Sequence, residues 1–494
     1  MSLARQLAER VTAMRYQDLP QEAVHGCKIA VLDTVGVALA GAAEDAAKLV
    51  EETLELRPGS GPSLIFGSTR RAGALDAALV NGVAAHALDF DNTAKHLGGH
   101  ASAVMVPALI AAGEAHGVGG RDLILAHAAG YEVGASIGRC LNPRHSEKGW
   151  HPTATIGVLA VAAACAKLLK LTAAQTGTAL ALATSLAAGH KANFGTMTKP
   201  LHAGQCARGG LFAALLARKG FTANPDAFEH KQGYFNLFGV GEVEAARALD
   251  GWGTWEIANP GASYKLYPCC YSTHSAVEAT LNLVRRHGPF DARQVVRIDS
   301  RTHERALAHT DRPDPDSPLA AKFSVQYCVA RAALDGRVVL EHFEGDAHRD
   351  PAVRDLLRRV HATPYTGKLF ADDDPLDAEV TITLADGRSY TEKVDRPLGR
   401  AADNAIADEH MKAKFENCAA RVLAPAAAAA ACRALETLER IGSVRELTTL
   451  LEPAGAGAGV RRNHPVRIPS PPPLSQAERG GSSLPFSSRE KGKG

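Results

Sequence analysis

The stretch TATIGVLAVAAACAKLL, residues 153–169, decides the fold class of this chain. Its small and aliphatic side chains recur at three- and four-residue spacing with few polar interruptions, which predicts a helix buried on most of its surface. The same spacing recurs in other stretches of the first half: residues 23–39, 104–116, 123–140, 173–188 and 203–219. Aromatic residues make up only 5% of the chain, so we expect an aliphatic core and close approach between helices.

Local signals mark the ends of several of these helices. Thr172 and Gln175 form a capping box, which predicts a helix start at Ala173. Gly189 and Gly220 occupy positions where a glycine commonly ends a helix. We therefore predict an all-helical domain over residues 1–262.

The pattern changes after residue 262. A helix is expected over Thr273–His287, and Gln294–Thr302 alternates like a strand. Residues 380–384 alternate into Asp386-Gly387, a hairpin turn signal, and a return strand follows through residues 390–394. The chain is thus expected to be mainly α, with a smaller α+β domain after the helical one.

The predicted boundaries divide the chain into three parts. Residues 1–262 form the helical domain and residues 263–402 the α+β domain, while helices within 403–450 pack back on the first domain. Residues 454–494 hold seven Gly, six Pro and six Ser with few large apolar side chains, so we predict a disordered tail there.

Charge and composition exclude several classes of protein. The 494 residues carry 55 Lys+Arg and 53 Asp+Glu, a net of +2; the tail contributes +5, which leaves +2 − 5 = −3 for the body. A nucleic-acid binder held by phosphate contacts would need a basic excess. No uninterrupted apolar stretch reaches the ~18–20 residues of a membrane span, and the N-terminus lacks the apolar core of a signal peptide. Nine scattered cysteines without a CxxC pair fit a reduced cytoplasm.

The densest group of reactive side chains lies between His86 and Ser102. It holds three histidines, two aspartates, a lysine and a Gly-Gly turn between two apolar helices, as expected of a loop that forms the wall of a site. Zinc is one alternative, although the HExxH spacing of helical zinc sites is missing. A solvated loop whose aspartates cap the next helix is another.

Two further segments place a base or a cation beside a helix start. His151 precedes Pro152 and falls at a helix N-cap, where the helix dipole favours a neutral, proton-accepting ring. Lys199 and Pro200 precede the helix expected from Ala203, so the ammonium and the helix amides can face one anion. The alternatives are a histidine that only starts a helix and an ordinary surface lysine.

A fourth segment lies at the predicted domain boundary, where clefts form. Lys265 and His274 add positive charge and a titrating group there, and Cys269 and Cys270 are expected to be buried, inert thiols. Together the four segments indicate a site for an anion with several carboxylates, where a base removes a proton and cations stabilise the resulting charge. No GxGxxG, P-loop or GxSxG motif indicates a nucleotide cofactor or a serine nucleophile.

These same segments resemble the MmgE/PrpD family, from about residue 5 to 450, with the tail outside the likeness. The matching stretches are LDTVGVALAG (32–41), HALDFDNT (86–93), GGHAS (98–102), GYEVGASIGR (130–139), GWHPTATIG (149–157), LAAGHKANFGTMTKPLHAG (186–204) and YPCCYSTHSAVEA (267–279). The family includes 2-methylcitrate dehydratase, cis-aconitate decarboxylase and an iminodisuccinate epimerase. The resemblance implies a large all-helical domain with a smaller α+β lid domain, a homodimer, and catalysis without a metal or organic cofactor.

The resemblance also implies the site residues. It places the active site in a cleft between the domains, at Asp89, Thr93, His100, His151, Lys199 and Lys265, with His202 and Tyr267 as neighbours. We expect His100 or His151 to move the proton and Asp89 to orient a histidine or a substrate hydroxyl. Lys199 and Lys265 would bind carboxylates, and Thr93, His202 and Tyr267 would complete the substrate site.

The expected function is a cofactor-independent lyase, a dehydratase or decarboxylase, acting on a small di- or tricarboxylate. An isomerase or epimerase using the same proton abstraction is the alternative, and a non-catalytic carboxylate-binding helical dimer is the remote one. Two positions depart from the family: Asn92 stands where it often has Asp, and Ala101 where it usually has Pro. These changes alter the local charge and relax the backbone beside His100. They point to a substrate different from those of the well-studied members and not to an inactive enzyme, since the histidines and lysines are kept.

Overall fold

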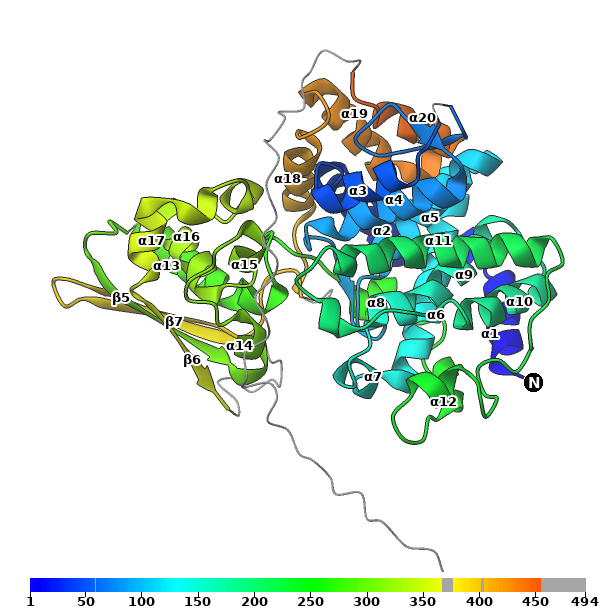
Figure 1. Cartoon of the computed structure of the whole chain (residues 1–494), viewed down its shortest axis with the longest axis horizontal. Coiled ribbons are helices and arrows are strands. Elements are labelled where there is room, and N and C mark those ends of the chain that lie inside the picture. The colour runs from blue at the N-terminus through cyan, green and yellow to red at the C-terminus, as the bar shows by residue number, and fades with distance from the viewer. Residues whose placement is uncertain (58, 289, 367–375, 401–403, 455–494) are drawn as a thin grey trace, which may run out of the picture. The chain divides into compact units, whose positions relative to one another are not determined.

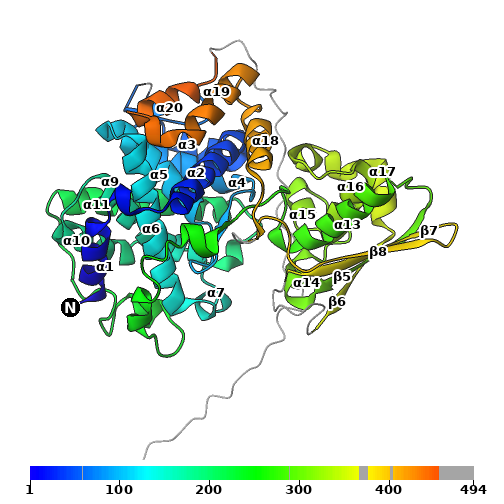
Figure 2. The ribbon, with the colours of Figure 1, turned by 180° about the vertical axis from the view of Figure 1, so that it is seen from behind.

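Helices dominate the computed structural model of this protein, which describes residues 1–57, 59–288, 290–366, 376–400 and 404–454 (Figures 1 and 2). A smaller part of the chain forms a four-stranded sheet with its own helices. This architecture confirms the predicted fold class, a mainly α protein with a large helical part and a smaller α+β part. The predicted tail lies, from residue 455 onward, outside the described residues.

The first part of the chain is built almost entirely of helices. They are α1 (Leu3–Ala13), α2 (Gln21–Gly41), α3 (Asp45–Thr53), α4 (Ala74–Ala87), α5 (Ala101–His116), α6 (Gly120–Leu141), α7 (Arg144–Glu147), α8 (Pro152–Thr155), α9 (Gly157–Leu168), α10 (Ala173–Thr184), α11 (Thr198–Arg218) and α12 (Tyr234–Phe238). Two short antiparallel pairs accompany them: β1 (Ser63–Leu64) with β2 (Arg71–Ala72), and β3 (Thr93–Ala94) with β4 (Ala262–Ser263). The stretch 153–169 is helical and almost wholly buried, with a break at Ile156 between α8 and α9.

Glycines allow two of these helices to pack closely, as the composition predicted. A Cβ at Gly82 of α4 would lie 2.8 Å from Cα of Gly204 in α11, and a Cβ at Gly204 would lie 2.5 Å from the Leu79 carbonyl oxygen. Both distances are shorter than side-chain contacts allow, so the two helices require glycine where they meet. This contact brings the end of α4 and the start of α11, which both carry reactive side chains, close together.

The structure confirms some of the predicted helix ends and contradicts others. The capping box of Thr172 and Gln175 is present, and Gly220 follows α11 in the left-handed conformation. Gly189 was wrongly placed at a helix end, because α10 already stops at Thr184; the Gly189 carbonyl instead accepts the His151 backbone N–H at 3.1 Å. Helix α11 begins at Thr198 rather than Ala203, since proline is tolerated in a first helical turn.

The sheet region, residues 267–394, confirms the predicted hairpin. Its strands are β5 (Val295–His303), β6 (Val360–Tyr365), β7 (Ala378–Leu384) and β8 (Ser389–Val394), in the order β6-β5-β7-β8. Strands β5 and β6 are parallel, and the other pairs are antiparallel. Its helices are α13 (His274–His287), α14 (Glu304–Thr310), α15 (Pro318–Lys322), α16 (Val325–Asp335) and α17 (Pro351–Leu357). Helices α13 and α16 cover one face of the sheet (Figure 1).

The last described helices return to the helical part. They are α18 (Asp408–Ala419), α19 (Pro425–Glu436) and α20 (Val444–Leu450); α18 and α19 pack on α2, and α20 packs on α5. One buried apolar cluster joins them to the first helices, while a second lies within the sheet region. The exact boundaries 1–262, 263–402 and 403–450 stay predictions.

Helix α2 has the length and apolar composition that could cross a membrane. Yet 72% of its most apolar window is buried inside the protein. Its Asp33 is also buried and contacts Lys414 of α18, with Oδ1 2.6 Å from Nζ. These contacts are those of a core helix.

Candidate active site

The loop after α4 carries the cluster of acidic and imidazole side chains. His86 lies in the last turn of α4, and Asp89 follows with a positive φ of 52°, a left-handed conformation that is uncommon for a residue with a Cβ. Strand β3 then pairs Thr93 with Ser263 of β4. This pairing brings Lys265, two residues beyond Ser263, to the loop.

Asp89 binds two lysines from distant segments. Its Oδ1 lies 2.7 Å from Nζ of Lys199 in α11 and 3.1 Å from Nζ of Lys265. Burial raises the pKa of Asp89, but the two ammonium groups outweigh it and hold this pKa well below its ordinary value. Burial lowers the pKa of Lys265, yet Asp89 more than compensates, so Lys265 stays charged. The site thus combines one carboxylate with two cations.

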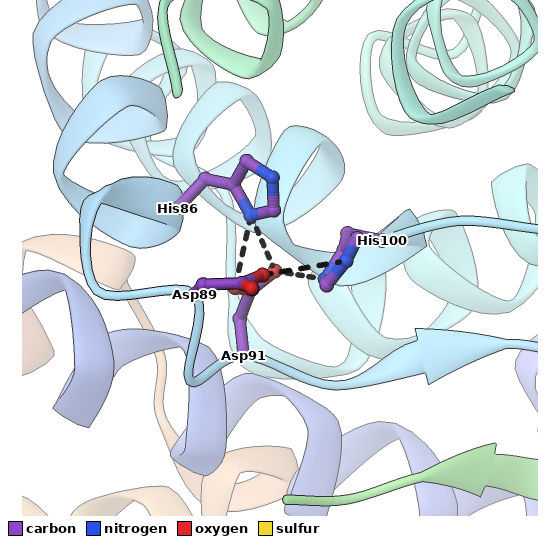
Figure 3. Close-up of side chains that lie close together, drawn as sticks. All are labelled: His86, Asp89, Asp91 and His100. Atoms are coloured by element: carbon purple, nitrogen blue, oxygen red, sulfur yellow. Dashed lines mark hydrogen bonds and ion pairs between the residues drawn. The ribbon is translucent and has the colours of Figure 1, made fainter. Parts of the chain in front are cut away.

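Asp91 bridges two histidines (Figure 3). Its Oδ1 lies 2.9 Å from Nδ1 of His86, and its Oδ2 lies 2.7 Å from Nδ1 of His100. Burial raises the pKa of Asp91, but the two imidazoles reverse the effect and keep the carboxylate ionised. Burial, only partly offset by Asp91, lowers the pKa of His86 to about 4. His86 is therefore neutral at physiological pH, and His100 is the partner that solvent can reach, with its side chain 11% exposed.

Two glycines place His100 beside the start of α8. Gly98 has a φ of 76°, and a Cβ at Gly99 would lie 2.5 Å from Oγ1 of Thr153. The same Oγ1 accepts the His100 backbone N–H at 3.1 Å. Consequently the Gly-Gly turn predicted from the sequence joins His100 to the segment that carries His151.

His151 is the N-cap residue of α8 with Pro152 at the first helical position, as predicted. Its Nδ1 lies 3.2 Å from Nδ1 of His202, and its ring meets Phe194 edge-on at 4.8 Å. Burial, together with the nearby Lys199 ammonium, lowers the pKa of His151 well below its ordinary value. A neutral imidazole that can accept a proton results.

Most of the residues predicted for the site meet in this cluster, and Tyr267 does not. Lys199, Lys265 and His100 lie around the Asp89 carboxylate, with His100 Nε2 3.9 Å from Oδ1. The His151 ring stacks on His86 at 6.1 Å and contacts His202, and Thr93 lies in β3. Tyr267 packs instead in the core of the sheet region, with its ring 5.1 Å from His274. The role of Tyr267 in substrate binding stays a prediction.

Three contacting residues were missed as site residues: His86, Asp91 and Phe194. His86 and Asp91 stand in the quoted loop, but their spacing does not reveal that they face each other. Phe194 forms a wall over two site residues, because Lys199 Nζ lies 5.2 Å from its ring centre. Asn92 has a physical explanation: its side-chain amide donates to Oδ2 of Asp33 at 2.9 Å, where an aspartate would place a second carboxylate.

A metal ion is a possible occupant by geometry alone. His86, Asp89, Asp91 and His100 offer ligand atoms within 4.8 Å of one another. However, Asp91 already bridges two imidazoles, and the ammonium groups of Lys199 and Lys265 contact Asp89. A dication would have to displace these partners against two positive charges. The arrangement fits a hydrogen-bonded acid–base network, which can bind an anion and transfer a proton.

Comparisons with known proteins match both parts of the chain. Residues 5–245 match the family model described as MmgE/PrpD N-terminal domain, and residues 267–440 match MmgE/PrpD C-terminal domain. The chain is 30% identical over 465 residues to the cis-aconitate decarboxylase of Mus musculus, covering 91% of this chain and 93% of that protein. It is 28% identical over 466 residues to that of Homo sapiens (91% and 95% covered). It is 30% identical over 410 residues to that of Aspergillus terreus (77% and 82%).

Proposed function

Because the chain belongs to the MmgE/PrpD family, we propose that it is a lyase that decarboxylates a small tricarboxylate. The observation that carries this proposal is the meeting at Asp89 of two buried ammonium groups, Lys199 and Lys265, with the His100 ring, whose Nε2 lies 3.9 Å from the same carboxylate oxygen. The relatives named cis-aconitate decarboxylase make cis-aconitate the first candidate substrate.

The proposed reaction uses the cations and the histidines together. Loss of carbon dioxide breaks a carbon–carbon bond and leaves its electron pair on the remaining skeleton. Lys199 and Lys265 compensate that charge by binding the remaining carboxylates, because buried ammonium groups act strongly in a site shielded from water. His100 delivers the proton to carbon, since its side chain is 11% exposed and its Nδ1 is held 2.7 Å from the Asp91 carboxylate. A proton from solvent then restores His100.

The role of His151 differs between decarboxylation and the alternative reactions, dehydration and epimerisation. As a neutral base it would remove a proton from carbon in a dehydration or an epimerisation. Water then leaves in the dehydration, whereas the proton returns to the other face in the epimerisation. Decarboxylation requires only the donor, so in the proposed reaction His151 positions His202 and the substrate. Thr93 and His202 would complete the binding site.

A binding and turnover screen tests the proposal. We expect small tricarboxylates to raise the melting temperature, because a ligand that binds only the folded state stabilises it. We expect cis-aconitate to release carbon dioxide. Stabilisation without any product would indicate a carboxylate-binding protein, and loss of water without carbon dioxide would indicate a dehydratase. The variant Lys199→Met should lose most of the stabilisation, whereas Lys191→Met, an exposed lysine bound to the Ser146 carbonyl, should keep it.

We further propose a homodimer that works in the cytoplasm without a metal or organic cofactor. All nine cysteines are free thiols, which supports a reducing compartment. Sedimentation of the purified protein tests the dimer. Turnover that survives extensive chelation would support metal independence, and loss that is reversed by one added metal would contradict it.

A further inference from the structure

Three consecutive backbone carbonyls around Asp89 each accept a hydrogen bond from a different lysine. Lys322 Nζ donates to the Leu88 carbonyl at 3.1 Å, and Lys414 Nζ donates to the Phe90 carbonyl at 2.8 Å. Between them, Lys265 Nζ donates to the carbonyl of Asp89 itself. A three-residue turn thus receives three ammonium groups, which we call the lysine clamp (Lys265, Lys322 and Lys414).

The members of the clamp come from separate parts of the chain. Lys265 follows β4, Lys414 lies in α18, and Lys322 ends α15 in the sheet region. All three are at most 8% exposed. The Lys322 carbonyl also accepts the Cys270 backbone N–H at 2.8 Å, which ties α15 to the segment that carries Lys265.

Two of the three lysines have a carboxylate in contact. Lys265 pairs with Asp89, and Lys414 lies 2.6 Å from Oδ1 of Asp33. Lys322 differs: its nearest described acceptor is the neutral Leu88 carbonyl, while Glu44 and Asp89 act on it only through space. A buried ammonium without a close carboxylate is unfavourable for folding. Burial accordingly lowers the pKa of Lys322, so stability alone does not explain why a lysine lies at this position.

The clamp holds a strained residue of the proposed site. Asp89 has its φ at 52°, and the same turn directs its carboxylate to Lys199 and Lys265. Lys322 is the one member of the clamp contributed by the sheet region. We infer that Lys322 is a positioning residue, which fixes the Leu88–Asp89 turn from the sheet region and so presents the Asp89 carboxylate correctly. The inference about turnover rests on the proposed function; the inference about the turn does not.

The test uses the full chain and the substitution Lys322→Met, which keeps the length and removes the donor. Its matched control is Lys167→Met, because Lys167 Nζ also donates to backbone carbonyls, those of Thr12 and Met14. Lys167 lies at the far end of α9, roughly 20 Å along the helices from His151. Should Lys322→Met not fold, Lys322→Gln replaces it, since the shorter amide keeps polarity but does not reach Leu88.

The first readout is hydrogen–deuterium exchange of peptides covering residues 86–92. We expect faster exchange in the Lys322 variant and unchanged exchange in Lys167→Met, with melting temperatures of both within about 2 °C of the wild type. Wild-type exchange in a folded Lys322 variant would overturn the inference. A uniform rise over the whole chain would also overturn it, because that pattern indicates a structural role.

The second readout is a double-mutant cycle with Asp89→Asn, using cis-aconitate as the probe. Lys322→Met should lower kcat roughly 10- to 100-fold in the wild-type background and less than about 2-fold in the Asp89→Asn background. Equal losses in both backgrounds would refute action through Asp89. If wild-type protein converts no polycarboxylate, the proposed function fails, and the exchange measurement alone decides the role of Lys322.

Discussion

Lys199→Met is the substitution whose effect can be worked out most fully from the structure. Lys199 and Lys265 supply two positive charges, and Asp89 and Asp91 supply two negative ones, so these four side chains have a formal charge of zero. Removing Lys199 lowers the charge of the site by one, and the site then attracts the carboxylates of the substrate less strongly. The fold should survive, because Lys265 still neutralises Asp89 at 3.1 Å.

The magnitude follows from one lost ion pair. At about 4 Å and an effective dielectric constant of about 20, an ammonium and a carboxylate attract by about 4 kcal/mol. That energy corresponds to a loss of roughly 10³-fold in kcat/KM. Steady-state kinetics with cis-aconitate, with Lys191→Met as the matched control, measures it. A folded Lys199→Met protein that kept kcat/KM within about threefold of the control would refute the assignment of Lys199.

Three further predictions concern the histidines and the start of α5. Activity should stay level as the pH falls to about 6, because burial and neighbouring charges lower the pKa of His151 and keep neutral the ring that positions His202 and the substrate. In Lys199→Met the pH below which activity falls should be higher, since one of the charges that lower the His151 pKa is gone; an unchanged pH profile would show that another group titrates. Burial lowers the pKa of His127 to about 4 in the folded protein. Between about pH 4 and 6.5 the unfolded chain therefore binds more protons than the folded protein, and the free energy of unfolding decreases as the pH falls through that window. In His127→Gln, measured by urea unfolding, the free energy of unfolding should therefore change with pH by about 3 kcal/mol less than in the wild type. A pH dependence equal to that of the wild type would contradict the assignment. Ala101→Pro should stabilise the protein by about 0.4–1 kcal/mol, since Ala101 is the first residue of α5; a lower melting temperature would show that His100 needs the flexible backbone.

The helical part could be predicted because its signals are local. Periodic small side chains, the Thr172 capping box and Pro152 at a helix start depend only on neighbours in the chain. The start of α11 was misjudged because proline is tolerated in a first helical turn, and the end of α10 was misjudged because the loop after it makes a tertiary contact. The loop that contains Gly189 leaves helical geometry to receive the His151 N–H, and no local spacing encodes that partner.

The residue types of the site could be predicted from the sequence, but the contacts between them could not. Histidines and lysines at helix starts pointed to an anion site, yet the pairing of Asp91 with His86 and His100 depends on how the loop turns at Asp89. Lys322 and Lys414 lie hundreds of residues from the turn they bind, so only the fold reveals them. Tyr267 lies two residues after Lys265 in the sequence, but its ring packs against His274 in the core of the sheet region, an orientation that the motif alone does not reveal.

Product analysis in deuterated water tests the central claim most directly. Purified protein is incubated with cis-aconitate in D₂O, and carbon dioxide and the organic product are followed by NMR. Proton delivery to carbon after decarboxylation predicts equal amounts of carbon dioxide and product, with one deuterium newly bound to carbon in each product molecule. Two results would contradict the account. One is deuterium bound to carbon in the tricarboxylate with no release of carbon dioxide, and the other is addition or loss of water as the only reaction.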